Sequence, residues 1–239
     1  MAHIKLENVD LSIPIFDYNS QSLRRELIKS SIGGNIETTG AISRVHVLRN
    51  VSLEIKNGET VGIVGHNGAG KSSFLRLLSG IYIPTSGHCS IEGDILSIIS
   101  LADGLEPSLS GRENIYRVGL MRGYDLGFLR EHEEHIVAFS ELNDFIDLPV
   151  RTYSSGMHLR LIFSVIASVN MDILLLDEFF AAGDAAFRSK AKARIDEMID
   201  DAKIFVFASH SMDLIKQYCN RVFLFNKGNV EEIDKSDLN

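Results

Sequence analysis

The stretch GHNGAGKS, residues 65–72, decides the predicted fold of this chain. It fits the phosphate-binding pattern G-x-x-x-x-G-K-[ST] at every fixed position. The apolar run VGIV at residues 61–64 precedes it, and the helix-like run SFLRLL at residues 73–78 follows it. Glycines let successive backbone N–H groups point into one hollow, and the helix N-terminus behind them adds partial positive charge. We therefore predict a nucleotide-phosphate site here, in preference to a glycine-rich turn without a ligand.

The residue types of this loop have separate predicted tasks. Lys71 is expected to reach the β- and γ-phosphates, and the Ser72 hydroxyl is expected to bind Mg²⁺. We expect the whole loop and the residue after it to contact the nucleotide: Gly65, His66, Asn67, Gly68, Ala69, Gly70, Lys71, Ser72 and Ser73.

Length and composition exclude several classes of protein. The 239 residues suffice for one large domain or two small ones, and the net charge of −8 argues against nucleic acid as the main partner. Two cysteines, Cys89 and Cys219, are too few for a disulfide framework or a cysteine-based metal site, which favours a reducing compartment. No secretory leader opens the chain, and no apolar run approaches the ~20 residues that a membrane-spanning helix needs.

Hydrophobic periodicity predicts strands before the loop and strand–helix alternation after it. An Asn57-Gly58 hairpin turn is predicted between the second and third strands, and Gly80 is predicted to cap the helix after the loop. Ser110 and Glu113 form a predicted capping box. The predicted strands are residues 4–9, 45–55, 60–64, 88–92, 95–101, 173–176, 204–208 and 222–225. The predicted helices are residues 73–78, 110–121, 128–139, 153–169, 190–201 and 212–218. Such alternation favours an α/β sheet covered by helices.

A second motif lies about a hundred residues after the loop, where the run ILLLDE occupies residues 173–178. It is an apolar strand that ends in two carboxylates. In a P-loop fold Asp177 is expected to bind Mg²⁺, and Glu178 is expected to orient or deprotonate the attacking water. The alternative without a catalytic role is a buried strand that ends in two surface carboxylates.

A third motif, YSSGM at residues 153–157, begins a predicted helix shortly before that strand. A serine at this place is by itself only a capping signal. In this order, however, the motifs resemble the ATP-binding-cassette (ABC) ATPase family, whose signature is usually Leu-Ser-Gly-Gly-Gln. The chain keeps Ser154 and Gly156 and differs at the other three positions. The resemblance implies that Ser154, Ser155 and Gly156 face the γ-phosphate of the ATP held by another subunit.

The resemblance continues to the end of the chain. Residues 181–184, AAGD, match the family's D-loop, with Asp184 at the acidic position. His210 follows an apolar strand at the place of the family's switch histidine, which contacts the γ-phosphate. The resemblance therefore implies an α/β P-loop NTPase core of the ABC ATPase type, with an N-terminal antiparallel β subdomain and an inserted α-helical subdomain.

Two departures from the family pattern concern ligand-binding positions. The family usually carries a metal-binding Gln after the strand at 95–101. Here Ser100 or Asp103 is the available substitute, and we assign Ser100 to the metal. In the family, an aromatic residue near the end of the first strand usually stacks on the adenine ring. Ile13 occupies that place, so Phe16 and Tyr18 are the predicted stacking residues. An insertion at residues 17–44 contains a possible amphipathic helix, with a surface loop as the alternative.

Within the family, five stretches resemble the ATPase subunits of bacterial polysaccharide exporters: residues 67–72, 80–87, 110–114, 153–157 and 183–187. This resemblance implies one nucleotide-binding domain over 1–239, with a helical subdomain at about 104–168. Some relatives carry a C-terminal carbohydrate-binding domain, which we do not expect here because the sequence ends at Asn239, soon after its last predicted strand. The resemblance further implies ATP and Mg²⁺ as ligands, a homodimer that closes on two ATP molecules, and separate transmembrane permease subunits. Lys71, Glu178 and His210 are the expected catalytic residues. The expected location is the cytoplasmic face of the inner membrane.

Other functions stay open at this point. The chain could serve an exporter of another substrate, such as a lipid or a drug, because the nucleotide motifs would be the same. It could also be a soluble, non-transport ABC ATPase, although those usually carry two cassettes, coiled coils or basic surfaces. A P-loop kinase or GTPase is disfavoured because no Asn-Lys-x-Asp motif is evident.

Overall fold

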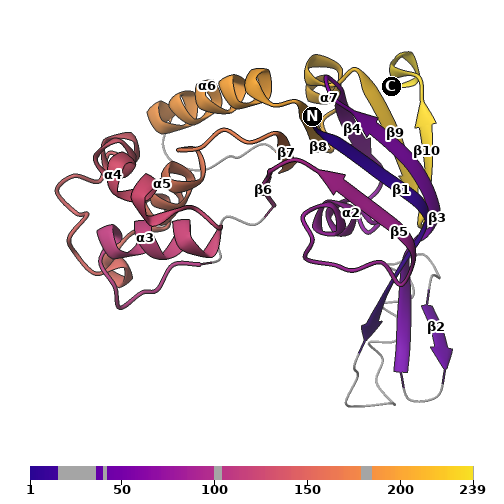
Figure 1. Cartoon of the computed structure of the whole chain (residues 1–239), viewed down its shortest axis with the longest axis horizontal. Helices are drawn as coiled ribbons and strands as arrows, with labels where there is room; N and C mark the ends of the chain where they lie inside the picture. The colour runs from indigo at the N-terminus through magenta and orange to yellow at the C-terminus, as the bar shows by residue number, and fades with distance from the viewer. Residues whose placement is uncertain (16–35, 40–41, 100–103, 179–184, 239) are drawn as a thin grey trace. The chain divides into compact units, whose positions relative to one another are not determined.

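The computed structural model describes residues 1–15, 36–39, 42–99, 104–178 and 185–238 (Figure 1). The chain divides into two compact units. Unit 1 contains Met1–Ile99, Asp172–Glu178 and Ala202–Asn239, and unit 2 contains Ser100–Met171 and Phe179–Asp201. Within the described ranges, none of the helices combines the length and the apolar character needed to span a bilayer.

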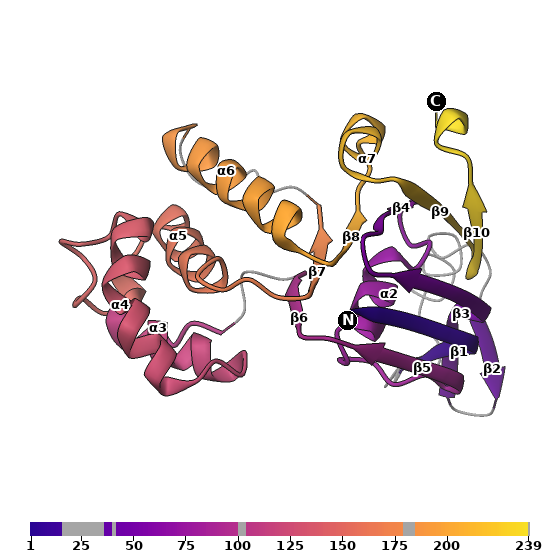
Figure 2. The same ribbon diagram turned by 45° about the horizontal axis from the view of Figure 1, so that its top comes forward.

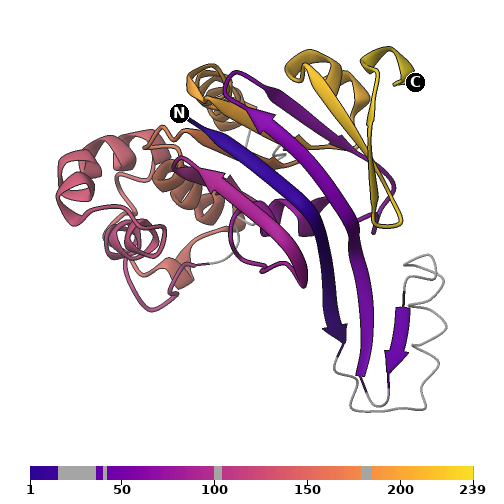
Figure 3. The ribbon, with the colours of Figure 1, turned by 45° about the vertical axis from the view of Figure 1, so that its right-hand side comes forward.

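Unit 1 begins with a four-stranded antiparallel sheet in the order β2-β3-β1-β5. Its strands are β1 (His3–Ile15), β2 (Ile36–Thr39), β3 (Ile42–Lys56) and β5 (Ser86–Glu92). The predicted strands at 4–9 and 45–55 are confirmed, but β1 and β3 are longer than predicted and curve together (Figure 3). The register between them shifts near Asn8 and Asn50, both with left-handed backbone, as expected where bulges bend a strand pair.

The second sheet of unit 1 has six strands in the order β10-β9-β4-β8-β7-β6. Its strands are β4 (Thr60–Val64), β6 (Ile95–Ile98), β7 (Ile173–Asp177), β8 (Ile204–Ala208), β9 (Arg221–Asn226) and β10 (Asn229–Ile233). The pairs among β6, β7, β8, β4 and β9 are parallel, and β10 is antiparallel to β9. Every residue of β8 is buried, which is why this strand is a continuous apolar run.

The predicted Asn57-Gly58 hairpin is wrong. A tight turn is present, because the Glu59 N–H donates to the Lys56 carbonyl oxygen at 3.0 Å. However, β3 stays in the antiparallel sheet, whereas β4 pairs with β8 and β9 in the other sheet. The last four residues of β4 are all buried, so this strand needs both faces covered, and a two-stranded hairpin cannot provide that. The strand β10, joined to β9 by a Lys227-Gly228 turn, was not predicted at all.

Two short helices cover the parallel sheet. Helix α2 (Lys71–Leu78) buries Phe74, which meets the Phe225 ring edge-on at 5.1 Å between centroids. The predicted cap at Gly80 is confirmed. The N–H groups of Gly80 and Ile81 donate to the carbonyls of Leu77 and Arg76, the pattern of a Schellman motif. Helix α7 (Met212–Tyr218) has the predicted limits and begins at an N-cap serine, Ser211.

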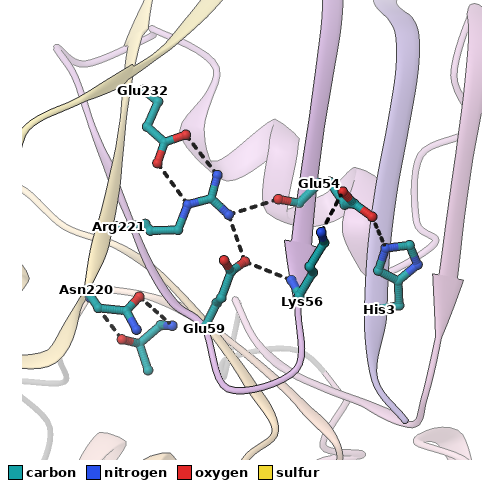
Figure 4. A network of polar contacts seen from close by, with 8 residues as sticks. His3, Glu54, Lys56, Glu59, Asn220, Arg221 and Glu232 are labelled. Atoms are coloured by element: carbon teal, nitrogen blue, oxygen red, sulfur yellow. Dashed lines mark hydrogen bonds and ion pairs between the residues drawn. The ribbon is translucent and has the colours of Figure 1, made fainter.

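A polar network connects the two sheets of unit 1 (Figure 4). Arg221, at the start of β9, donates two hydrogen bonds of 2.8 Å to the Glu232 carboxylate. Its Nη1 also donates to Glu59 Oε2 at 2.7 Å and to the Glu54 carbonyl oxygen at 2.9 Å. Because Glu54 belongs to β3, the guanidinium joins β9 and β10 to the antiparallel sheet.

Unit 2 is helical. Its elements are α3 (Gly111–Met121), α4 (Leu126–Ser140), the short 3-10 helix η1 (Val150–Thr152), α5 (Ser155–Ile166) and α6 (Ala185–Asp201). The capping box is confirmed: the Glu113 N–H donates to Ser110 Oγ at 3.2 Å, and the Ser110 N–H donates to Glu113 Oε2 at 2.8 Å. Helix α4 begins two residues earlier than predicted because Asp125 caps it. Helix α6 begins five residues earlier and lies alongside α5 (Figure 2).

Candidate nucleotide-binding site

The loop between β4 and α2 needs glycine at two positions. Gly65 and Gly70 have φ values of +148° and +108°, which residues other than glycine rarely adopt. A Cβ atom on Gly65 would clash with the Phe225 carbonyl oxygen, and one on Gly70 would lie 2.9 Å from the Val47 carbonyl oxygen. The loop is thus held against β9 on one side and β3 on the other.

The start of α2 is suited to an anion. Gly70 is the N-cap and supplies no side-chain hydrogen bond, while its carbonyl accepts the first helical bond from the Phe74 N–H at 2.8 Å. The earlier N–H groups of the helix, from Lys71 to Ser73, have no partner within the helix itself. They converge at the positive end of the helix dipole, where a phosphate group is favoured.

A cavity of about 550 Å³ lies over this helix start, within the size range of small-molecule sites. Its lining consists of unit 1 residues: Val45, His46, Val47, Asn67, Gly68, Ala69, Gly70, Lys71, Ser72, Ser73, Ile99, Asp177, Glu178, His210 and Gly228. Ten residues predicted for the site from three separate motifs therefore meet in one cavity.

The remaining two loop residues, Gly65 and His66, hold the lysine. Lys71 Nζ donates to their carbonyl oxygens at 2.7 and 3.2 Å, and lies 3.4 Å from His210 Nε2. Lys71 is 8% exposed. Burial lowers the pKa of Lys71, and the nearby charges of Asp177 and Glu178 oppose that shift because they favour the ammonium. The cation is thus fixed at the floor of the cavity.

The two carboxylates and the histidine come from the ends of neighbouring strands. Asp177 is the last residue of β7, and Glu178 follows it with a φ of +60° and an N–H that donates to the Ala208 carbonyl at 2.9 Å. His210 lies two residues beyond β8, and its Nε2 is 3.7 Å from Glu178 Oε1. Because β7 and β8 are parallel, their carboxyl ends deliver these groups to the same edge of the sheet as the loop.

The oxygen donors of this cavity fit Mg²⁺. Ser72 and Asp177 are both lining residues, and their side chains carry a hydroxyl and a carboxylate. Across the described part of the chain, no group of three or more His, Cys, Asp or Glu side chains forms a metal cage. Mg²⁺ does not need one, because it commonly takes one or two protein oxygens, with water and substrate phosphates as its other ligands.

Three predicted residues lie in unit 2, at the start of α5. Ser154 is the N-cap, and its Oγ accepts a hydrogen bond from the Met157 N–H at 3.3 Å. Ser154 and Ser155 are exposed, and Gly156 is half-buried. The sequence motif therefore corresponds to an exposed helix N-terminus with a hydroxyl group at its tip.

Four predicted site residues, Phe16, Tyr18, Ser100 and Asp184, lie outside the described residues, as does most of the 17–44 insertion. Conversely, sequence reasoning missed the β3 wall of the cavity, Val45, His46 and Val47. The strand itself was predicted, but no local pattern marks which of its residues meet the loop. His46 Nδ1 lies 2.9 Å from Ser12 Oγ on β1.

Comparison with known proteins agrees with this geometry. The family model described as "ABC transporter" matches residues 48–181. The chain is 46% identical to the O-antigen export system ATP-binding protein RfbE of Yersinia enterocolitica, over 97% of this chain and 98% of that protein. It is 42% identical to the teichoic acids export ATP-binding protein TagH of Lactococcus lactis, over 85% of this chain but only 43% of that protein.

Solved structures show the same fold. An ATP-binding cassette, MJ0796, solved as a dimer with ADP and phosphate, superimposes with a TM-score of 0.67. The match covers 97% of this chain and 99% of that one, at 20% sequence identity. The mixed arrangement of an antiparallel β sheet, a parallel-stranded sheet and helices is therefore that of an ABC ATPase. The chain belongs to the ABC transporter family, as an ATP-binding subunit that hydrolyses ATP.

Proposed function

We propose that this chain powers the export of a lipid-linked polysaccharide, of the O-antigen kind, across the inner membrane. The observation that carries this proposal is the 46% identity, along nearly the full length of both chains, to a protein named for O-antigen export. The TagH relatives, named for teichoic acid export, support the same chemical class of cargo. In this proposal residues 1–239 form one nucleotide-binding domain, with its helical subdomain at about 104–168.

The proposed catalytic unit is a pair of copies closed head to tail around two ATP molecules. Each ATP lies in the unit 1 cavity of one copy and is covered by Ser154, Ser155 and Gly156 of the other, with Asp184 beside them. The cavity accounts for one side of the nucleotide, and the exposed N-terminus of α5 is a second anion site. The split arrangement makes hydrolysis depend on association of the two copies.

Within each site the residues have distinct tasks. Lys71 neutralises the β- and γ-phosphates, and His210 contacts the γ-phosphate. Glu178 orients the attacking water and accepts its proton. Ser72 and Asp177, with Ser100, hold Mg²⁺, which when bound supplies charge neutralisation at the phosphate oxygens. Phe16 or Tyr18 stacks on the adenine ring.

The work of hydrolysis passes to separate transmembrane permease subunits in this proposal. The chain then lies at the cytoplasmic face of the inner membrane, attached through these permease subunits. The proposed contact region is residues 100–114 with the adjoining helices.

The nucleotide chemistry is tested with the Glu178→Gln and Lys71→Ala variants of the purified chain. Glu178→Gln should bind ATP as tightly as the unaltered chain, lose hydrolysis, and accumulate as a dimer in gel filtration with ATP and Mg²⁺. Lys71→Ala should lose nucleotide binding itself. Normal hydrolysis by Glu178→Gln would refute its role, and an ATP-loaded monomer would refute the paired site.

The cargo is tested in cells. Loss of the chain should remove a polysaccharide from the cell surface and leave its lipid-linked precursor inside, and complementation with Glu178→Gln should fail. Affinity purification from detergent extracts should recover a membrane-spanning permease. An unchanged surface polysaccharide, together with a defect in another exported lipid or drug, would replace this cargo with that one.

A further inference from the structure

The end of helix α4 carries a residue that local preferences oppose. Glu141 is the C-cap of α4 and adopts a left-handed backbone, with φ 58° and ψ 33°. Glycine is usual at such a cap because it has no Cβ atom, and asparagine is tolerated because its short polar side chain can hydrogen-bond locally. A carboxylate is also unfavourable beside the partial negative charge of a helix C-terminus. Something outside α4 must therefore stabilise the glutamate.

Two cations from two other helices provide that stabilisation. Glu141 Oε2 accepts a hydrogen bond from Arg160 Nη1 of α5 at 3.1 Å, and Glu141 Oε1 accepts one from Lys190 Nζ of α6 at 3.2 Å. One carboxylate thus binds both helices with a separate oxygen for each. We call Glu141, Arg160 and Lys190 the three-helix junction.

Aromatic rings also contact the same two cations. The Arg160 guanidinium carbon lies 5.1 Å from the Phe187 ring centroid, and Lys190 Nζ lies 4.6 Å from that of Phe139. Phe187 is 1% exposed, and the Phe139, Phe163 and Phe187 rings lie 6.0–6.1 Å apart. The packed rings supply apolar cohesion, so the Glu141 carboxylate adds orientation to helices that pack together without it.

A second contact joins the end of α5 to the middle of α6. Arg194 of α6 donates from Nε to the Ala167 carbonyl oxygen at 2.8 Å and from Nη2 to Asn170 Oδ1 at 2.7 Å. Helices α5 and α6 are therefore joined at two places along their length. The three-helix junction is the one nearer their N-terminal ends.

These N-terminal ends follow the two segments that the proposed function assigns to the partner's ATP. Helix α5 begins one residue after Ser154, and α6 begins one residue after Asp184. We propose that Glu141 is a positioning residue for hydrolysis, because it joins α5, which begins directly after Ser154, to α4 and α6 and so orients the Ser154 end of α5 toward the partner subunit. This inference rests on the proposed paired site.

The test is Glu141→Asn, which suits the left-handed cap and removes the carboxylate shared by Arg160 and Lys190, while the hydrogen bond from Lys190 Nζ to the Phe139 carbonyl oxygen at 2.9 Å remains. Glu131→Asn is the matched control, because Glu131 is an exposed residue of α4 that undergoes the same change in charge and size. Glu141→Asn should have an unfolding midpoint no lower than that of the unaltered chain. Its nucleotide Kd should stay within about twofold, since the cavity belongs to unit 1.

The diagnostic measurement is kcat at saturating ATP. We expect Glu141→Asn to reduce kcat about tenfold or more, and to reduce the ATP-trapped dimer when combined with Glu178→Gln. The control should change neither quantity. An unchanged kcat in Glu141→Asn, or a loss that follows a lowered unfolding midpoint, would overturn the inference.

Failure of the inference can be told apart from failure of the proposed paired site. Ser154→Ala is assayed beside these variants, because Ser154 acts directly on the partner's nucleotide in that proposal. Full activity in Ser154→Ala would refute the paired site. Reduced activity in Ser154→Ala together with full activity in Glu141→Asn would refute the positioning role alone.

Discussion

Replacing Gly70 with alanine should weaken nucleotide binding much more than it destabilises the fold. Gly70 has a φ of +108°, and its added Cβ atom would lie 2.9 Å from the Val47 carbonyl oxygen. Holding an ordinary residue in a sparsely populated backbone region costs about 1–3 kcal/mol. The contact is with backbone atoms of β3, so a side-chain rotation cannot relieve it. The loop can relax by leaving β3, and nucleotide binding must then restore its shape.

Taking the upper part of that range, about 2–3 kcal/mol, the predicted loss of ATP affinity is about 30- to 150-fold. Titration of the purified chain with a fluorescent ATP analogue measures it. Gly80→Ala is the matched control, because Gly80 also has a positive φ, +75°, but no atom lies within 4 Å of its added Cβ. That control should lose stability without losing affinity. A Kd for Gly70→Ala within twofold of the unaltered value would refute the reasoning.

Two further predictions concern the polar network of Figure 4. Arg221→Met leaves the Glu59 and Glu232 carboxylates without their shared cation, and Arg221 and Glu59 are only about a quarter exposed. The expected loss of unfolding free energy is about 2 kcal/mol, between the values for surface and buried ion pairs. Differential scanning calorimetry should show it as a Tm lower by about 4–8 °C. A shift below about 1 °C would contradict this prediction. Hydrogen bonding to Arg221 lowers the pKa of Glu232 in the folded chain. The ion pair therefore stabilises the fold fully above the pKa of Glu232 in the unfolded chain, about 4.3. This stabilisation is lost as the pH falls through the lower pKa of Glu232 in the folded chain. Tm measured against pH should therefore fall less steeply below about pH 4.3 in Arg221→Met, whereas parallel curves would exclude this pair as a source of acid sensitivity.

The sequence by itself determined the features that depend on neighbouring residues. The phosphate loop, the Ser110 capping box, the Gly80 cap and the Ser154 N-cap all involve groups within a few positions of each other. Their hydrogen bonds form between residues that are already close along the chain, so residue types and spacing suffice to predict them. The apolar strand that ends at Asp177 was equally evident, because a strand buried on both faces must be continuously apolar. The roles of the site residues stay predictions, and Phe16, Tyr18, Ser100 and Asp184 also lie outside the described residues.

Only the tertiary structure decided the features that join distant segments. The Asn57-Gly58 turn connects two different sheets, although its sequence is typical of a hairpin, because the partners of β4 lie about 140–160 residues further along the chain. The β3 wall of the cavity and the three-helix junction at Glu141 likewise depend on contacts between segments far apart in sequence. Long-range packing stabilises these arrangements even where local preference opposes them, as the left-handed Glu141 shows. Local patterns therefore predicted the residues of the candidate site, while non-local packing decided which strand forms the β3 wall of the cavity and how the helices of unit 2 join one another.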